Sequence, residues 1–150
     1  MKVIKTAALS FVCALMLIGT VHAEENAESN ALKGIKLGFG FDRGFGVIGT
    51  LGKFNGFLGN DGIAVDYIFV KKELNAENTK GLYWYVGGGG FGDWDGDWGA
   101  RLPVGGEFYF AKNLDVYAQL IPRLRVNNNN KNNDRADFGL DFGIGVRYQF

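Results

Sequence analysis

The side chains that most often carry nucleophilic catalysis are scarce in this sequence of 150 residues. The one cysteine, Cys13, and the one histidine, His22, both fall within the first 23 residues, and beyond them the only serine is Ser29. Hydrolases and acyltransferases usually activate a serine or cysteine with a nearby histidine. Because no such pair exists beyond residue 23, we expect no enzyme and no cofactor, although carboxylate or tyrosine chemistry stays open.

Three carboxylates alternate along one short segment, at Asp93, Asp95 and Asp97. This spacing resembles the start of a calcium-binding loop, which also needs a glycine at its sixth position and a glutamate at its twelfth. Trp98 and Val104 occupy those two positions, so the match fails. We predict an acidic hairpin that gathers divalent cations weakly, and no dedicated metal site.

A second set of charged residues occurs within segments that are otherwise apolar or glycine-rich. Charges in an apolar setting need partners of opposite sign or access to water. Such a set therefore predicts either a closed network of ion pairs or a path for ions. Its members are Asp66, Arg101, Glu107, Asp115, Arg123, Arg125, Asp137, Asp141 and Arg147.

The segments that must position these charges have a hydrophobic period of two, which is typical of β-strands. In residues 138–150 every second residue is apolar or aromatic, and those between are charged, polar or glycine. In 63–70 the alternation places Asp66 on the same face as Val70. For 81–91 it leaves open which face points outward. The seven predicted segments are 35–42, 45–51, 63–70, 81–91, 98–110, 113–126 and 138–150.

An eighth strand is required if these segments form a bacterial transmembrane barrel. Both chain ends of such a barrel lie in the periplasm, so the number of strands is even. Segment 53–60 supplies the missing strand, because it lies between a turn at 52–53 and an Asn-Asp-Gly sequence with hairpin chemistry at 60–62. We therefore predict an all-β fold, an eight-stranded antiparallel up-and-down transmembrane β-barrel over 35–150.

The two faces of the predicted strands differ in bulk. In the last three segments one face carries Phe, Tyr, Leu or Ile at nearly every position, and the other mixes glycine with charges. Eight strands leave an interior that side chains just fill. The glycine-containing face fits that interior, so we expect paired charges inside and apolar bulk outside, facing lipid. A soluble periplasmic ligand-binding barrel, with the apolar face inside, is the alternative.

The first 23 residues predict a secretory signal peptide: two lysines precede an apolar run, and small residues follow at the cleavage position. The polar segment 24–34 predicts a flexible periplasmic lead-in. Without Lys2 and Lys5, 14 basic residues face 16 acidic ones, a net charge of −2. Since nucleic-acid binding calls for a basic patch, we expect no nucleic acid partner.

The ending Gly-Ile-Gly-Val-Arg-Tyr-Gln-Phe, residues 143–150, resembles the C-terminal strand of Gram-negative outer-membrane proteins. The segments 87–90 and 101–107 are similar to those of short barrels of the OmpA-transmembrane, OmpX and opacity-protein type. The resemblance implies location in the cell outer membrane and recognition of Tyr148 and Phe150 by the barrel-assembly machinery. It also implies outer-membrane lipids and lipopolysaccharide as partners of a monomer with a structural or surface-recognition role. A small channel or passive transporter is the alternative function.

Overall fold

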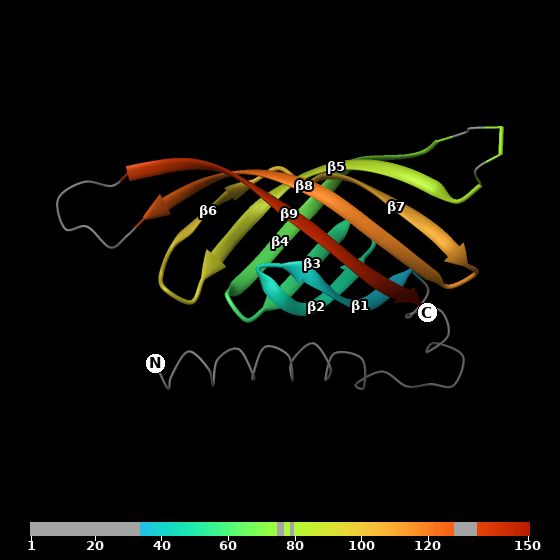
Figure 1. Cartoon of the computed structure of the whole chain (residues 1–150), viewed down its shortest axis with the longest axis horizontal. Coiled ribbons are helices and arrows are strands. Elements are labelled where there is room, and N and C mark those ends of the chain that lie inside the picture. Colours follow the sequence, from blue (N-terminus) through green and yellow to red (C-terminus); the bar gives the residue numbers. More distant parts are fainter. Residues whose placement is uncertain (1–33, 75–76, 79, 128–134) are drawn as a thin grey trace. The chain divides into compact units, whose positions relative to one another are not determined.

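The computed structural model describes residues 34–74, 77–78, 80–127 and 135–150 (Figure 1). The predicted signal peptide and all of the predicted lead-in except Gly34 lie outside these described residues. The described residues contain no helix with the length and hydropathy needed to cross a membrane. The strands are β1 (Ile35–Asp42), β2 (Gly44–Leu51), β3 (Phe54–Gly59), β4 (Gly62–Glu73), β5 (Leu82–Asp93), β6 (Trp98–Arg101), β7 (Val104–Ala111), β8 (Leu114–Asn127) and β9 (Arg135–Gln149).

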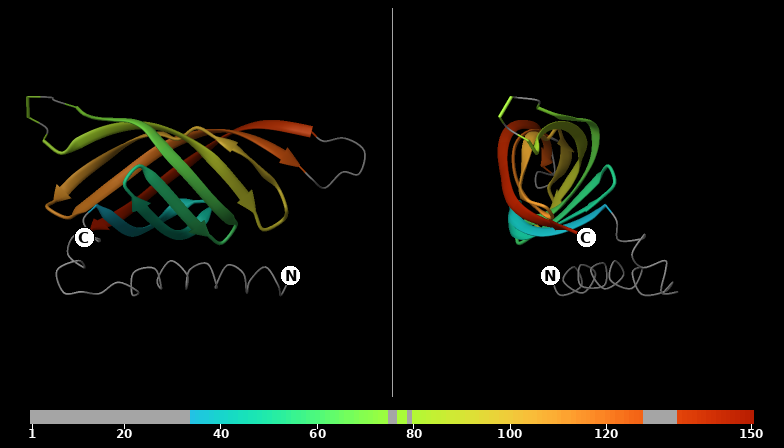
Figure 2. Two further views of the ribbon diagram at one scale, coloured as in Figure 1. Left: turned by 180° about the vertical axis from the view of Figure 1, so that it is seen from behind. Right: turned by 90° about the vertical axis from the view of Figure 1, so that its right-hand side faces the viewer.

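The strands form one closed antiparallel barrel, visible along its length in Figure 2. Neighbours in sequence pair with one another, and β1 pairs with β9 to close the wall. β6 and β7 together occupy a single strand position in the barrel wall, because both pair with β5 on one side and with β8 on the other. We call each strand position of the wall a stave. The wall therefore has eight staves, and the predicted eight-stranded antiparallel barrel is confirmed.

The barrel has two distinct ends. At the proximal end β1 begins and β9 finishes, and the Phe150 N–H donates to the Ile35 carbonyl at 3.0 Å. The distal end carries the connections between β1 and β2, β3 and β4, β5 and β6, and β8 and β9. The β4–β5 hairpin projects furthest at the proximal end, and β8 and β9 project furthest at the distal end (Figure 1).

The eighth strand, which the even strand count and the two flanking turns predict, is present as β3. Its bounds, Phe54–Gly59, lie within the predicted segment 53–60, and it pairs with β2 and β4. The last strand begins earlier than predicted, at Arg135 rather than residue 138.

The predicted strand 98–110 is interrupted at Leu102 and Pro103, and the chain's two prolines explain the interruption. Gly87 N–H donates to the Pro103 carbonyl and Leu102 N–H donates to the Pro122 carbonyl, both at 2.9 Å. A proline has no N–H with which to return such a bond. Each proline therefore removes one ladder bond from the same short part of the wall, which divides the stave into β6 and β7.

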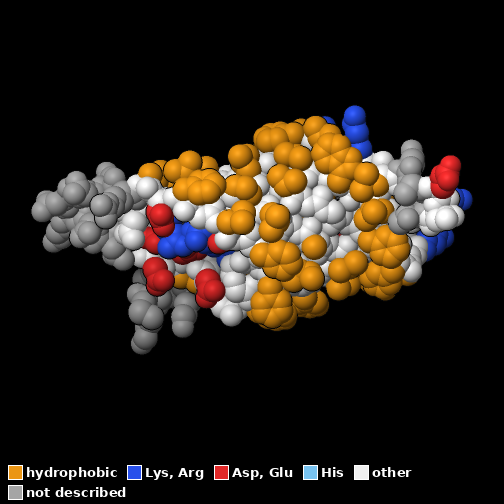
Figure 3. Space-filling view, turned by 45° about the horizontal axis from the view of Figure 1, so that its top comes forward, with side chains coloured by type: hydrophobic (Ala, Val, Ile, Leu, Met, Phe, Trp, Pro, Cys, Tyr) orange, Lys and Arg blue, Asp and Glu red, His pale blue; other side chains and the backbone are white. Residues whose placement is uncertain are grey.

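Large apolar side chains cover the outside of the wall. Phe39 and Phe138, for example, are 63% and 71% exposed. In Figure 3 apolar side chains spread over the wall, and the charged side chains in view gather toward its ends. β5 follows the same rule: Tyr85 is buried, so the face of β5 that carries Tyr83 and Tyr85 points inward.

A β-bulge in β4 reverses the alternation near the proximal end. The register with β5 shifts between Ile68 and Val70. Val70, which the alternation placed on the inner face with Asp66, is exposed instead. Lys71 then points into the barrel, where it pairs with Glu107. An extra residue in one strand has this effect because successive side chains point to opposite faces.

Glycines give the narrow interior room for large side chains. Gly40 of β1 and Gly145 of β9 are paired across the sheet. A Cβ at Gly40 would lie 2.7 Å from the Tyr117 hydroxyl oxygen, and one at Gly145 would lie 2.7 Å from Tyr117 Cε1. The tyrosine ring thus occupies space that any other residue at these two positions would fill.

Candidate functional site

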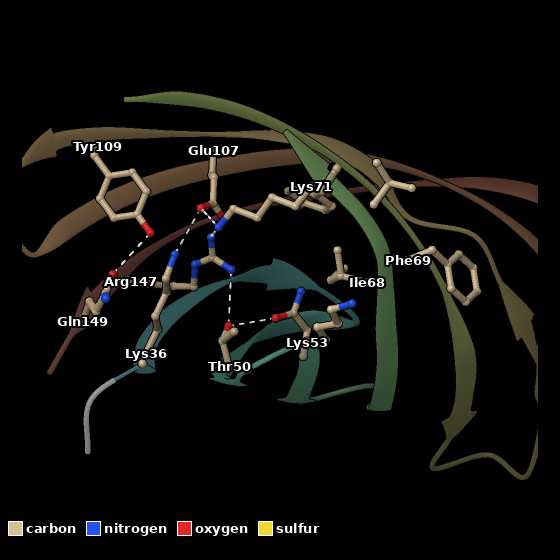
Figure 4. A pocket seen from close by; sticks show the side chains of 15 residues that line it. Lys36, Thr50, Lys53, Ile68, Phe69, Lys71, Glu107, Tyr109, Arg147 and Gln149 are labelled. Carbon is tan, nitrogen blue, oxygen red and sulfur yellow. Dashed lines mark hydrogen bonds and ion pairs between the residues drawn. The ribbon is translucent and has the colours of Figure 1, made fainter. Parts of the chain in front are cut away.

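Among the described residues, charged side chains form three groups inside the barrel, and the proximal cluster, part of which is drawn in Figure 4, is the most extensive. It consists of Lys36, Lys71, Glu107, Asp115 and Arg147. Arg147 contacts Glu107 Oε2 at 2.6 Å and donates from Nε to Asp115 Oδ1 at 2.8 Å. Lys36 Nζ donates to Glu107 Oε1 at 3.1 Å and to Asp115 Oδ2 at 2.9 Å, and Lys71 also donates to Glu107 Oε1. Five strands, β1, β4, β7, β8 and β9, bring these residues together, and the bulge in β4 turns Lys71 toward the others.

The proximal cluster is anchored to neighbouring polar and aromatic groups. Arg147 donates to Thr50 Oγ1 at 3.3 Å, and that hydroxyl donates to Asn55 Oδ1 at 2.8 Å. The Arg147 guanidinium lies 4.7 Å from the centre of the Tyr117 ring. Contacts of this kind position the guanidinium and offset part of the cost of removing it from water.

The central cluster consists of Asp42, Asp66 and Arg101. Arg101 donates to both carboxylate oxygens of Asp42, at 2.8 and 2.5 Å, and its Nε lies 3.0 Å from Asp66 Oδ1. A bidentate pair of this kind is the strongest hydrogen-bonded arrangement of an arginine and a carboxylate. Gln119 donates to Asp42 Oδ2 at 3.2 Å and accepts from the Tyr85 hydroxyl at 2.8 Å.

The distal cluster consists of Arg43, Asp93, Arg123 and Asp141. Arg43 Nε lies 2.7 Å from Asp93 Oδ1, and Arg123 Nε lies 2.7 Å from Asp141 Oδ2. Arg43 also reaches Asp141 at 3.5 Å, which links the two pairs. The Arg43 guanidinium lies 4.0 Å from the centre of the Phe91 ring.

Each end of the barrel contains a cavity. The proximal cavity has a volume of about 510 Å³ and is lined by residues that include Lys36, Glu107 and Arg147. The distal cavity has a volume of about 460 Å³ and is lined by residues that include Arg43 and Asp141. The two cavities share no lining residue.

The inner face of β8 runs from the proximal cluster to the distal cluster. Between Asp115 and Arg123 its inward residues are Tyr117, Gln119 and Ile121, and all three are buried. Tyr117 also belongs to a buried apolar cluster inside the barrel, whose other members are Ile48, Phe57, Ala64 and Phe91. Buried apolar side chains thus lie inside the barrel together with the ionic clusters.

Eight of the nine charged residues singled out in the sequence form ion pairs in the barrel. Seven of them belong to the clusters already defined, and the eighth, Arg125, contacts Asp97 at 3.5 Å. Asp137 falls at an inward-facing position of the alternation in β9. Its side chain is nevertheless exposed, because β9 extends at the distal end there.

Sequence reasoning did not single out Lys36, Asp42, Arg43 and Lys71. For Lys36 and Asp42 the signal was available, because both alternate with the apolar residues of 35–41. Arg43 lies in the connection between β1 and β2, where the alternation of a strand does not predict which way a side chain points. Lys71 follows the bulge, which no local pattern marks.

The acidic hairpin does not bring its three carboxylates together. Asp93 pairs with Arg43 and Asp97 with Arg125. Across the described residues, no three His, Cys, Asp or Glu side chains are grouped closely enough to hold a metal ion. Weak gathering of cations at the exposed Asp95 stays a prediction.

The aromatic residues of the predicted assembly signal lie on the outer face of β9 at the proximal end. The rings of Tyr148 and Phe150 are 5.1 Å apart in an edge-to-face arrangement, and both are close to half exposed. No family model matches the sequence, and no curated protein or solved structure matches it either.

Proposed function

We propose that this chain is a non-enzymatic integral β-barrel of a Gram-negative outer membrane, with a structural or surface-recognition role. The single observation that carries the proposal is the inversion of polarity across the wall. Large apolar side chains cover the outside, whereas ion pairs are buried inside. A protein in water normally does the reverse, and large exposed apolar surfaces mark contact with another apolar phase. A closed barrel suits that phase because its strands pair with one another around the whole circumference.

The arrangement of the ends supports one orientation. An even number of staves brings the start of β1 and the end of β9 to the proximal end, which we assign to the periplasm. Tyr148 and Phe150, at the same end, match the C-terminal pattern that the barrel-assembly machinery reads in similar proteins. The distal connections would then face outward, toward lipopolysaccharide.

The location can be tested by fractionating cells that express the full chain. We expect recovery in the outer-membrane fraction, extraction only with detergent, and a shift in gel migration after boiling, because a folded barrel resists unfolding in detergent at room temperature. Recovery of the processed chain in the soluble periplasmic fraction without detergent would instead identify a soluble ligand-binding barrel.

We further infer that side chains fill the interior, so that the barrel is not an open pore. The support is the row of buried side chains on β8, Tyr117, Gln119 and Ile121, between the proximal and distal clusters. In a planar lipid bilayer the purified barrel should therefore give no reproducible large conductance steps. Steps of uniform size that recur in independent preparations would favour the small channel or passive transporter.

A further inference from the structure

A notch lies in the wall beside the proximal cavity, where β4 continues beyond the start of β3. β3 begins at Phe54, opposite Tyr67, whereas β4 continues to Glu73. Ile68 N–H donates to the Lys53 carbonyl at 2.8 Å, and beyond that point the register pairs β4 with β5 alone. The Gly52–Lys53 turn forms one side of the notch and residues 69–71 form the other, and all of them line the cavity.

The cavity has an excess of positive charge. Lys36, Lys53, Lys71 and Arg147 line it together with one carboxylate, Glu107. Counting Asp115, which pairs with Lys36 and Arg147 behind the lining, four cations face two carboxylates. This excess of two positive charges lies in a site where Lys36 and Arg147 are buried, and buried charge calls for a partner of opposite sign.

The central cluster carries the opposite excess, with one arginine against two aspartates. It lies deeper in the barrel than the proximal cavity. The Tyr85 hydroxyl donates to Gln119, and Gln119 in turn donates to Asp42 of the central cluster. The negative excess therefore does not line the proximal cavity, whose surface stays cationic.

The lysines retain donors for a ligand. An ammonium group has three hydrogens. Lys36 uses two of them on Glu107 and Asp115, and Lys71 uses one on Glu107. Lys53, on the turn, also lines the cavity but lies outside the ion-pair cluster, and its ammonium is 5.9 Å from the centre of the Tyr67 ring (Figure 4). Lys36 and Lys71 therefore keep ammonium hydrogens that the ion pairs do not use.

The rim of the notch is apolar. Phe69 and Val70 line it and are 55% and 39% exposed. In Figure 4 Phe69 points to the opposite side of β4 from Lys71. A cationic interior next to an apolar outer rim matches an amphipathic ligand, with its anionic group inside and its hydrocarbon along the wall.

We propose that the proximal cavity binds a phosphate group, and that the notch admits this group from the headgroup of an anionic lipid. Lysine is a common phosphate ligand, and basic pockets at the membrane surface bind anionic headgroups. A volume of about 510 Å³ falls within the range of small-molecule sites, about 300–1,000 Å³. The phosphate site stands whether or not the barrel spans a membrane, whereas the lipid as its source rests on the proposed function.

The test is binding by calorimetry at low salt, with the purified chain in a non-ionic maltoside detergent. One arm titrates inorganic phosphate and the other titrates dihexanoyl phosphatidylglycerol, with the phosphatidylcholine analogue for comparison. We expect the double variant Lys53→Gln/Lys71→Gln to weaken binding of both anions at least tenfold. Tighter binding of phosphatidylglycerol than of phosphate or phosphatidylcholine would support a lipid source, and equal binding of the lipid and phosphate would overturn that source.

The matched control is Lys72→Gln/Lys112→Gln, which removes the same charge at the same end of the barrel. Lys72 follows Lys71 on β4 and Lys112 lies in the β7–β8 turn, and both are exposed and absent from the cavity lining. Binding in this variant should stay within twofold of the unaltered chain. Equal losses in both double variants, or no measurable binding of either anion, would overturn the site. If Lys71→Gln impairs folding, Lys53→Gln alone tests it, because Lys53 lies outside the ion-pair cluster.

Discussion

Replacing Arg147 with methionine should lower the free energy of unfolding by up to about 3–5 kcal/mol, because it removes one partner from each of two buried carboxylates and leaves them paired with lysines alone. The Arg147 side chain is 2% exposed and contacts Glu107 and Asp115, which are 4% and 0% exposed. Methionine keeps much of the apolar volume, so the loss reports mainly the missing charge. Urea unfolding in lipid vesicles, followed by tryptophan fluorescence, measures it.

The matched control is Arg125→Met. Arg125 makes one long contact of 3.5 Å with Asp97, and its side chain is 29% exposed. Exposed pairs of this kind contribute about 0–1 kcal/mol. Equal losses for the two variants would contradict a buried network.

The sequence was enough to predict the wall of the barrel. A period of two reports directly which side chains share a face, and eight staves followed from the requirement that both ends meet on one side. β3 is the clearest case, because its own six residues carry little alternation. The bulge in β4 and the break at Pro103 were not predicted, because each depends on pairing with a neighbouring strand.

Alternation gives the face of a residue but not its depth or its partner. Asp137 has the parity of Arg147, yet it is exposed because β8 and β9 extend at the distal end. Lys36 meets Glu107 and Asp115 from 71 and 79 residues away along the chain. Which charges meet depends on the stagger of all the staves, which no local pattern specifies.

The outer face offers the sharpest test of the membrane assignment, through Leu120→Arg. Leu120 lies midway along β8 between Val104 and Phe142, and all three are about half exposed. If this belt faces hydrocarbon, an arginine at its middle should cost about 2–4 kcal/mol. On a soluble barrel an exposed leucine tolerates the change within about 0.5 kcal/mol. Urea unfolding of the barrel in phosphatidylcholine vesicles measures the difference.

Leu74→Arg makes the same substitution where the predicted cost is small. Leu74 directly follows β4 on the projecting hairpin, is 43% exposed, and donates its N–H to the Leu82 carbonyl. Near a membrane interface an arginine costs about 0–1 kcal/mol. The two leucines are similarly exposed and differ in their position along the barrel, so a large loss at Leu120 alone would measure the depth of the apolar belt. Equal, small losses of stability at both positions would contradict insertion into the membrane. Only a hydrocarbon layer makes the same arginine costly at one depth and tolerable at another.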